Sequence, residues 1–202
     1  ERDAEALRFA LLLDGGWGTP VEPQVREAVV AAAKTFEAAG AIVEPVQPWA
    51  DRSMIEGVDL FWRTRFWIEM EALPEERRNA ILPFIRAWAE GGAGHSGEAL
   101  HKGYTQTLNI RKATVDATQP YDYVLSPTSP MPAFAAELPC PTNDVTRPFD
   151  HIAFTLAYNM SEQPAASINC GYTADGLPIG LQIAGRRFDD LGVLQIARAW
   201  ER

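Results

Sequence analysis

The chain has 202 residues, 47% of them hydrophobic, which is enough for one large domain whose core needs no disulfide or metal. Its formal net charge of −9 argues against a nucleic-acid-binding surface and against a polybasic membrane anchor, because both need an excess of Lys and Arg. Two cysteines are too few for a disulfide-rich scaffold or a cysteine zinc cage.

The opening part of the chain predicts a strand, a helix and a second strand. The apolar run at residues 7–13 is typical of a buried strand. Pro23 suits the first turn of a helix, and Gly40 supplies the left-handed residue that ends one. Residues 41–46 predict the second strand. Because the connections are short, these elements form a βαβ unit, and at least part of the sheet is parallel.

The middle of the chain is predicted to be helical. Ser53 and Glu56 have the spacing of a capping box, which favours a helix that continues to about Glu71. Ser96 is expected to cap a further helix. The apolar residues expected to share one face of this further helix are Leu100, Tyr104, Leu108 and Val115.

The last third of the chain predicts strands again. Residues 121–125 predict a strand that runs into an extended, proline-rich loop. Residues 165–169 and 179–184 predict two strands connected through the turn-forming pair Asp175-Gly176. Acidic residues then begin a closing helix. The residues of this helix expected to point inward are Leu191, Leu194, Ala197 and Trp200.

Together, these elements predict a single α/β domain over residues 1–202. We expect a layered helix–sheet–helix arrangement with a mixed, partly parallel sheet and a helical insert at about residues 50–118. The sequence contains no internal repeat and no clear linker that would divide it.

Motifs for nucleophilic, metal and phosphate chemistry are weak. Ser96 follows His95, but Glu98 replaces the second glycine of a nucleophile elbow, so Ser96 is more consistent with a helix cap. His95 and His101 are six residues apart, which does not place them on one helical face for a metal. Residues 15–18 are glycine-rich but lack the lysine of a P-loop and the spacing of a dinucleotide turn. We therefore expect no metal and no cofactor.

The most specific pattern lies near the C-terminus. It consists of Asn159, the pair Pro164-Ala165 and the run Gly176-Leu177-Pro178-Ile179-Gly180-Leu181-Gln182. In this order, the residues closely resemble the C-terminal region of the amidase signature family. Residues 121–128 resemble the family's Asp-x-hydrophobic-Pro-Thr strand and loop, and the opening βαβ unit resembles the one that follows the family's catalytic serine loop. One departure is Glu162, where the family usually has glycine.

This resemblance implies carboxamide hydrolysis by a Ser–cisSer–Lys triad that lies in the N-terminal half of family members. No Gly-Gly-Ser-Ser-like run occurs in residues 1–202, so we expect no catalytic residue in this chain. The chain is interpreted as the C-terminal portion of an amidase and is expected to be inactive alone. An alternative is a non-catalytic, amidase-like domain that serves binding or assembly.

The resemblance also suggests two substrate-binding residues, in a short helix predicted from Phe149 to Tyr158. In family members that hydrolyse glutamine, an aspartate in this helix binds the substrate amine. Ile152 stands at the matching position, which argues against glutamine and for a less charged or apolar amide. Ile152 and Thr155, expected on one face of the helix, are our candidates for substrate binding.

Expected partners follow from the same interpretation. In family members the sheet continues into strands from the N-terminal half, so this chain is expected to expose a sheet edge and to self-associate through it. Besides a small amide substrate for the full-length protein, we expect neither a nucleic acid nor a membrane partner. Residue 1 is Glu, and charged residues follow it rather than the pattern of a signal peptide, so we expect a cytoplasmic protein.

Overall fold

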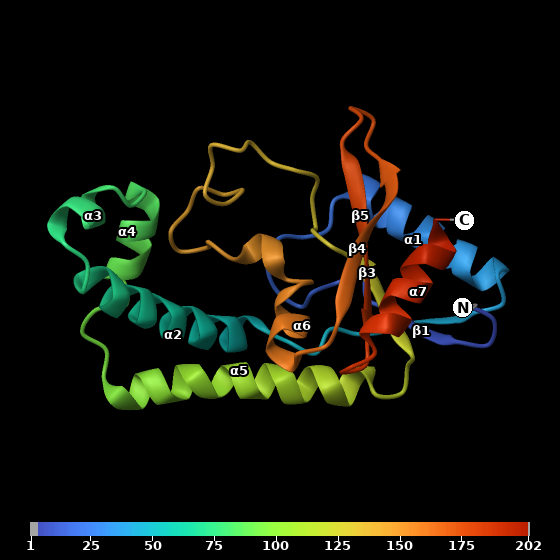
Figure 1. Ribbon diagram of the computed structural model, residues 1–202, viewed down its shortest axis with the longest axis horizontal. Coiled ribbons are helices and arrows are strands. Elements are labelled where there is room, and N and C mark those ends of the chain that lie inside the picture. The colour runs from blue at the N-terminus through green and yellow to red at the C-terminus, as the bar shows by residue number, and fades with distance from the viewer. Residues whose placement is uncertain (1–3, 202) are drawn as a thin grey trace. The chain divides into compact units, whose positions relative to one another are not determined.

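The computed structural model describes residues 4–201, which divide into two compact units (Figure 1). The first unit comprises the residues up to Ala50, Ile110–Ala133 and the residues from Asp150 onward. The second unit comprises Asp51–Asn109 and Phe134–Phe149. The interpretation of the whole chain as a single domain stays a prediction.

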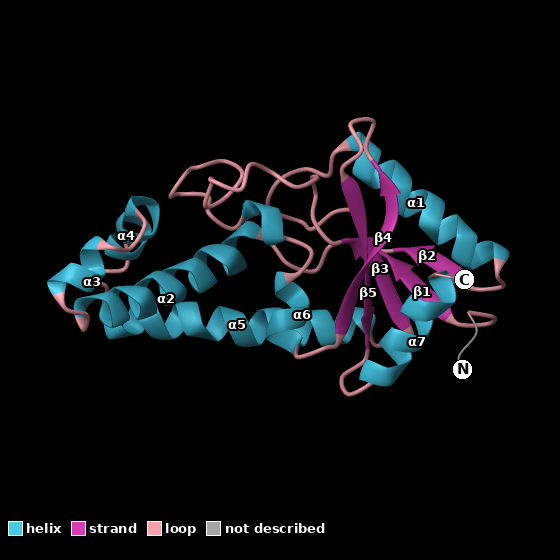
Figure 2. Cartoon of the chain, turned by 45° about the horizontal axis from the view of Figure 1, so that its top comes forward, coloured by secondary structure: helices cyan, strands magenta, loops and turns pink. Residues whose placement is uncertain are grey.

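The first unit contains a five-stranded sheet with the strand order β2-β1-β3-β5-β4 (Figure 2). Strand β1 is parallel to β2 and β3, whereas β5 is antiparallel to β3 and β4. The predicted mixed, partly parallel sheet is therefore confirmed. The elements of this unit are β1 (Arg8–Leu11), α1 (Pro23–Ala38), β2 (Ile42–Pro45), β3 (Tyr123–Pro127), the 3₁₀ turn Asp150–Ile152, α6 (Leu156–Ser161), β4 (Ala165–Tyr172), β5 (Pro178–Gly185) and α7 (Asp190–Trp200).

The opening βαβ unit forms as predicted. Pro23 occupies the first turn of α1, where its missing N–H removes no hydrogen bond. Gly40 follows the helix with a φ of +92°, a conformation that glycine adopts without steric cost. The chain then enters β2, which pairs with β1 in parallel from Arg8 opposite Ile42 onward.

The main core lies between one face of the sheet and helices α1 and α7 (Figure 1). Phe9 of β1 is completely buried and packs between two other rings. Its ring centroid lies 5.0 Å from that of Phe36 in α1 and 5.6 Å from that of Tyr123 in β3. The Phe36 ring in turn lies 5.7 Å from Trp200 of α7. Aromatic packing thus joins two parallel strands and both helices on this face.

The opposite face of the sheet is covered by α6 and the adjacent turn. Gln182 of β5 is buried there, and its Nε2 donates to Ser126 Oγ at 3.0 Å and to the Phe154 carbonyl at 2.8 Å. Gln163, directly after α6, donates to the Gly185 carbonyl at 2.8 Å. Because buried amides need hydrogen-bond partners, these bonds fix α6 on the sheet. The helix–sheet–helix layering predicted from the sequence is confirmed.

Glu162 ends α6 in the left-handed conformation, with a φ of +59°. Left-handed backbone favours glycine, so a glutamate at this position is strained. The Glu162 carboxylate forms ion pairs with both Arg111 and Arg187. These two charge pairs offset the backbone strain.

The predicted inward face of the closing helix is correct for two residues and wrong for two. Ala197 is buried in the core and Trp200 packs against it, but Leu191 and Leu194 are exposed, and Val193 and Ile196 are buried instead. Both faces of α7 carry large apolar residues, so periodicity alone does not identify the buried one.

The second unit contains helices and an irregular segment. Its helices are α2 (Arg52–Glu71), α3 (Glu75–Asn79), α4 (Pro83–Glu90) and the first part of α5 (Gly97–Thr118), which ends in the first unit. Helix α2 ends at Glu71 as predicted, but its capping residue is Asp51 rather than Ser53. Asp51 Oδ1 accepts from the Met54 N–H at 3.1 Å and from the Ser53 hydroxyl at 2.6 Å. These hydrogen bonds lower the pKa of Asp51.

The start of α5 confirms one prediction and contradicts another. Ser96 Oγ accepts from the Ala99 N–H at 3.1 Å, so Ser96 is the cap of this helix. The apolar residues expected to share one face do not form a buried one, because Tyr104, Leu108 and Val115 are exposed and Leu100 is only half-buried.

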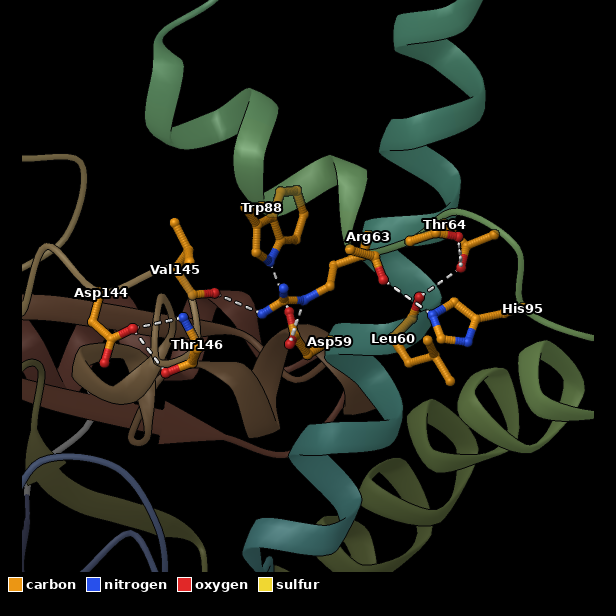
Figure 3. A network of polar contacts seen from close by, with 11 residues as sticks. Asp59, Leu60, Arg63, Thr64, Trp88, His95, Asp144, Val145 and Thr146 are labelled. Carbon is orange, nitrogen blue, oxygen red and sulfur yellow. Dashed lines mark hydrogen bonds and ion pairs between the residues drawn. The ribbon is translucent and has the colours of Figure 1, made fainter.

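A polar network holds the second unit together (Figure 3). The carboxylate of Asp59 in α2 accepts from Arg63 Nε at 2.7 Å and from Trp88 Nε1 of α4 at 2.8 Å. Arg63 Nη2 also donates to the Val145 carbonyl at 2.7 Å. Both charged side chains are largely buried, 15% exposed for Arg63 and 19% for Asp59. The network therefore ties the irregular segment 134–149 to two helices of its own unit.

The aromatic core yields a stability prediction. We expect Phe9→Ala to lower the free energy of unfolding by about 3–5 kcal/mol, because it leaves a cavity between two strands and two helices. Ile42→Ala on the neighbouring strand is the control and is expected to cost at most about 1 kcal/mol, since Ile42 is 51% exposed. Urea unfolding followed by circular dichroism measures both, and equal losses would contradict the prediction.

Candidate functional site

The topology of the sheet points to one edge as the place for a ligand. After β1 the chain continues to β2 on one side, and it later returns to β3 on the other side of β1. All three strands are parallel, so the loops after β1 and β3 leave the sheet at the same edge. Ligands of open α/β sheets bind at such a change in strand order, outside the carboxyl ends of the strands.

A cavity of about 440 Å³ lies in the first unit at this edge. It is formed by the loop between β1 and α1, residues 12–22, which we call the glycine loop, and by the start of α1. The lining residues are Leu13, Asp14, Gly15, Gly16, Trp17, Gly18, Thr19, Pro20, Val21 and Arg26. The volume is that of a site for a small molecule.

The conformation of the glycine loop depends on its glycines. Gly16 and Gly18 have φ values of +75° and +84°, which residues with a Cβ rarely adopt. Asp14 Oδ1 accepts from the Gly16 N–H at 2.8 Å and closes the turn. Trp17 is buried and supplies an apolar wall to the cavity.

The segment with the two predicted substrate-binding residues packs directly on this loop. The Thr19 N–H donates to the Asp150 carbonyl at 2.9 Å. A Cβ on Gly18 would lie 2.3 Å from that same carbonyl oxygen, and a Cβ on Gly15 would lie 2.7 Å from the Ala153 Cβ. The glycines therefore allow the two segments to come into contact, although they are more than a hundred positions apart in the chain.

Ile152 and Thr155 lie close together, but the single helix predicted from Phe149 to Tyr158 does not form. Ile152 ends the 3₁₀ turn, and α6 begins only at Leu156. The backbone N–H and the hydroxyl of Thr155 both donate to the Ile152 carbonyl, at 3.0 and 3.2 Å. Neither residue is among those that line the cavity. Their role in substrate binding stays a prediction.

A pair of hydroxyl groups lies at the carboxyl end of β3. Thr128 Oγ1 is 2.7 Å from Ser167 Oγ of β4, and the Thr128 N–H donates to the Gly180 carbonyl at 3.0 Å. The loop that begins at Thr128 reaches the end of the glycine loop, where the Glu22 N–H donates to the Pro130 carbonyl at 2.8 Å. Hydroxyl groups both donate and accept, so this pair can bind the oxygen or the nitrogen of an amide.

The cavity carries opposite charges on an otherwise uncharged lining. Asp14 supplies an acceptor, and Arg26 supplies donors, one of which reaches the Leu13 carbonyl at 3.4 Å. In the adjoining segment, burial lowers the pKa of His151, which favours its neutral form at pH 7. These groups can orient a polar ligand, and Trp17 can cover its apolar part.

The described residues offer few groups that could catalyse a reaction. Lys102 pairs with Glu98 at 2.6 Å, and Lys112 pairs with Asp116, both within helix α5. Among residues 4–201, no three His, Cys, Asp or Glu side chains are arranged to hold a metal ion. Within the same residues, none of the helices combines the length and apolar character that a membrane span requires.

The sequence pointed to the segment that packs on the glycine loop, but it did not point to the glycine loop itself. The glycine loop satisfies none of the phosphate-binding patterns, so no motif marks it as a site. A usable signal was present, because a glycine-rich turn after the first strand of a βαβ unit lies at the carboxyl edge of the sheet.

Comparisons with known proteins agree with one another. The family model described as Amidase matches residues 1–194. A glutamyl-tRNA(Gln) amidotransferase subunit of Myxococcus xanthus is 46% identical over 93 residues, covering 46% of this chain and 19% of that protein. The corresponding protein of Lactococcus lactis is 27% identical over 99% of this chain and 45% of its own length.

Solved structures give the same result for the fold. A bacterial aryl acylamidase matches with a TM-score of 0.81 and 24% identity, over 99% of this chain and 44% of that one. A glutamyl-tRNA(Gln) amidotransferase subunit of Thermotoga maritima matches with a TM-score of 0.68 and 27% identity, over 98% and 43%. The chain therefore spans less than half the length of the relatives that it matches.

The glycine loop yields a prediction about stability. We expect Gly18→Ala to destabilise the protein by about 2 kcal/mol or more, because it combines positive φ with a steric clash against the Asp150 carbonyl. Gly176→Ala is a matched control, since Gly176 has a φ of +82° but no atom within 4 Å of an added Cβ. Equal losses for the two variants in urea unfolding would show that the contact with residue 150 is unimportant.

Proposed function

The chain belongs to the amidase family, and on this basis we propose that it is the C-terminal portion of an amidase-signature hydrolase. Such an enzyme converts a carboxamide into a carboxylate and releases ammonia or an amine. The Ser–cisSer–Lys triad implied by the family resemblance would come from outside these 202 residues. The observation that carries the proposal is the family match over residues 1–194.

The geometry of the first unit suggests what this portion contributes. The glycine loop and the segment 150–155 meet at the carboxyl edge of the sheet, beside a cavity of about 440 Å³. We propose that this edge supplies one wall of the substrate site, with Ile152 and Thr155 facing the acyl part of the amide. Chemistry and positioning would then be divided between two regions of a longer protein.

Ile152 supports a proposal about the substrate. An apolar side chain provides no counter-charge for the ammonium group of glutamine, so binding that group here would leave it desolvated and unpaired. We therefore propose a less charged or apolar amide as the substrate. This distinguishes the chain from relatives whose names refer to the amidation of glutamyl-tRNA.

The activity proposal predicts two results. The purified 202-residue chain should release no ammonia from simple amides, and a longer protein that includes an upstream serine loop should release it. Within the longer protein, we expect Ile152→Asp to raise the kcat/KM for glutamine relative to that for an apolar amide, because a carboxylate would pair with the substrate ammonium. A coupled ammonia assay measures both.

Two outcomes would contradict the activity proposal. Ammonia release by the clean 202-residue chain would contradict the placement of the triad. A longer protein without activity and without a Gly-Ser-rich serine loop would instead support the binding or assembly alternative. The cytoplasmic location expected from the sequence stays a prediction.

We also propose self-association through a sheet edge. Strands β2 and β4 are the edges of the sheet, and β4 is the longer, with eight residues. Unpaired backbone groups on such an edge can pair with another strand. The β4 edge is therefore the surface through which we expect strands of two copies to pair.

The edge proposal predicts the effect of one added charge. Tyr172 lies at the end of β4 and is 69% exposed, so Tyr172→Lys should reduce the association of the chain without unfolding it. Ile42→Lys places the same charge on the other edge and is the control. Light scattering measures the mass of each variant, and an unchanged mass for Tyr172→Lys would contradict pairing through β4.

A further inference from the structure

Helix α7 exposes an apolar stripe that the fold does not use. Phe188, just before the helix, is 85% exposed, and Leu191 and Leu194 are 67% and 62% exposed. The opposite side of the same helix is buried in the main core through Val193 and Ile196. A surface helix with apolar residues on both faces is unusual, because the outer face of such a helix is normally polar.

Charged residues flank this stripe in a symmetric pattern. Asp190, Leu194 and Arg198 are spaced four residues apart, so they form one ridge along the exposed side of α7. Leu194 lies midway, with the acid on its N-terminal side and the base on its C-terminal side. Among residues 4–201, no ion pair involves Asp190 or Arg198.

The position of Phe188 at the end of the stripe is held by its neighbours. The guanidinium carbon of Arg187 lies 5.1 Å from the centre of the Phe188 ring, a cation–π contact. Arg187 is itself held by its ion pair with Glu162. One end of the apolar stripe is therefore bounded by the ion pair of Arg187 and Glu162.

We propose that the exposed face of α7 binds a second copy of this chain, with the two helices antiparallel about a two-fold axis at Leu194. In that arrangement Leu194 meets Leu194 of the partner subunit. Asp190 faces Arg198 of the partner subunit, and the reverse pair forms on the other side of the axis. The same surface of each copy therefore complements itself, which is the requirement for a closed two-fold interface.

The charges favour the antiparallel orientation of the two helices and a second copy of the chain as the partner. A parallel pairing would place acid against acid and base against base, which is unfavourable. The ridge is neutral as a whole, whereas the chain carries a net charge of −9. Two copies repel each other through their overall charge, and the ridge of α7 is a place where they attract.

Sedimentation equilibrium tests this pairing by charge exchange in the 202-residue chain that carries Tyr172→Lys, so that pairing through the β4 edge does not mask the result. We expect a dimer that weakens about tenfold for Asp190→Arg and for Arg198→Asp, because each change turns two attractions into repulsions. The double variant, Asp190→Arg with Arg198→Asp, should recover the parent affinity to within about threefold. Both positions are exposed, so circular dichroism should show unaltered folding.

Two controls separate this dimer from other association. Glu27→Arg makes the same change in net charge as Asp190→Arg, at an exposed position of α1, and should not weaken the dimer. Tyr172→Lys blocks the proposed β4 edge and should also leave α7 pairing intact.

Four outcomes would overturn the proposal. The first three are a chain that stays monomeric at high concentration, single variants that match the parent, and a double variant that does not recover. Association that is lost in Leu194→Ser but is insensitive to both charge changes would also overturn it, and would indicate that another part of a longer amidase covers this face. None of these results depends on amidase activity, so failure here is distinguishable from failure of the proposed function.

Discussion

Aromatic packing around Phe9 is the contact on which the arrangement of the first unit depends. Phe9 lies on the strand between β2 and β3, and its ring packs against Phe36 and Tyr123. This packing fixes α1 over the parallel part of the sheet and aligns β1 with β3. The loops after those two strands then leave the sheet at one edge, and the cavity lies there, lined by the glycine loop and the start of α1.

Strands and helices of this chain were predictable where the sequence pattern has a single physical cause. Strand β1, helix α1 and the β4–β5 hairpin appear where they were expected, because apolar runs, Pro23 and Gly176 each favour one local structure. The buried faces of α5 and α7 were not predictable. The buried positions of α5 are Gly103, Ile110, Thr114 and Thr118. A Cβ on Gly103 would lie 2.6 Å from the Gly57 carbonyl, and Thr114 bonds to its own helix. Only Ile110 is a large apolar residue, so the helical spacing of apolar residues does not mark this face.

The candidate site was only partly accessible from sequence for a related reason. The resemblance near the C-terminus pointed to the segment that packs on the glycine loop, and it gave residues 152 and 155 as neighbours. It did not give the partner of that segment, because the glycine loop lies more than a hundred residues earlier and matches no phosphate motif. The contact exists only because two glycines permit the backbones to approach, a condition that becomes visible once both segments are placed.

Glu162 shows how a substitution can depend on distant positions. Its left-handed backbone would suit glycine, and the glutamate is retained by two arginines, Arg111 and Arg187, that come from different elements. Removal of either arginine leaves the Glu162 carboxylate with one ion pair instead of two. Substitutions at these three positions are therefore expected to be non-additive. A glycine at 162 would need neither ion pair, so the loss of Arg111 or Arg187 should cost more beside Glu162 than beside glycine.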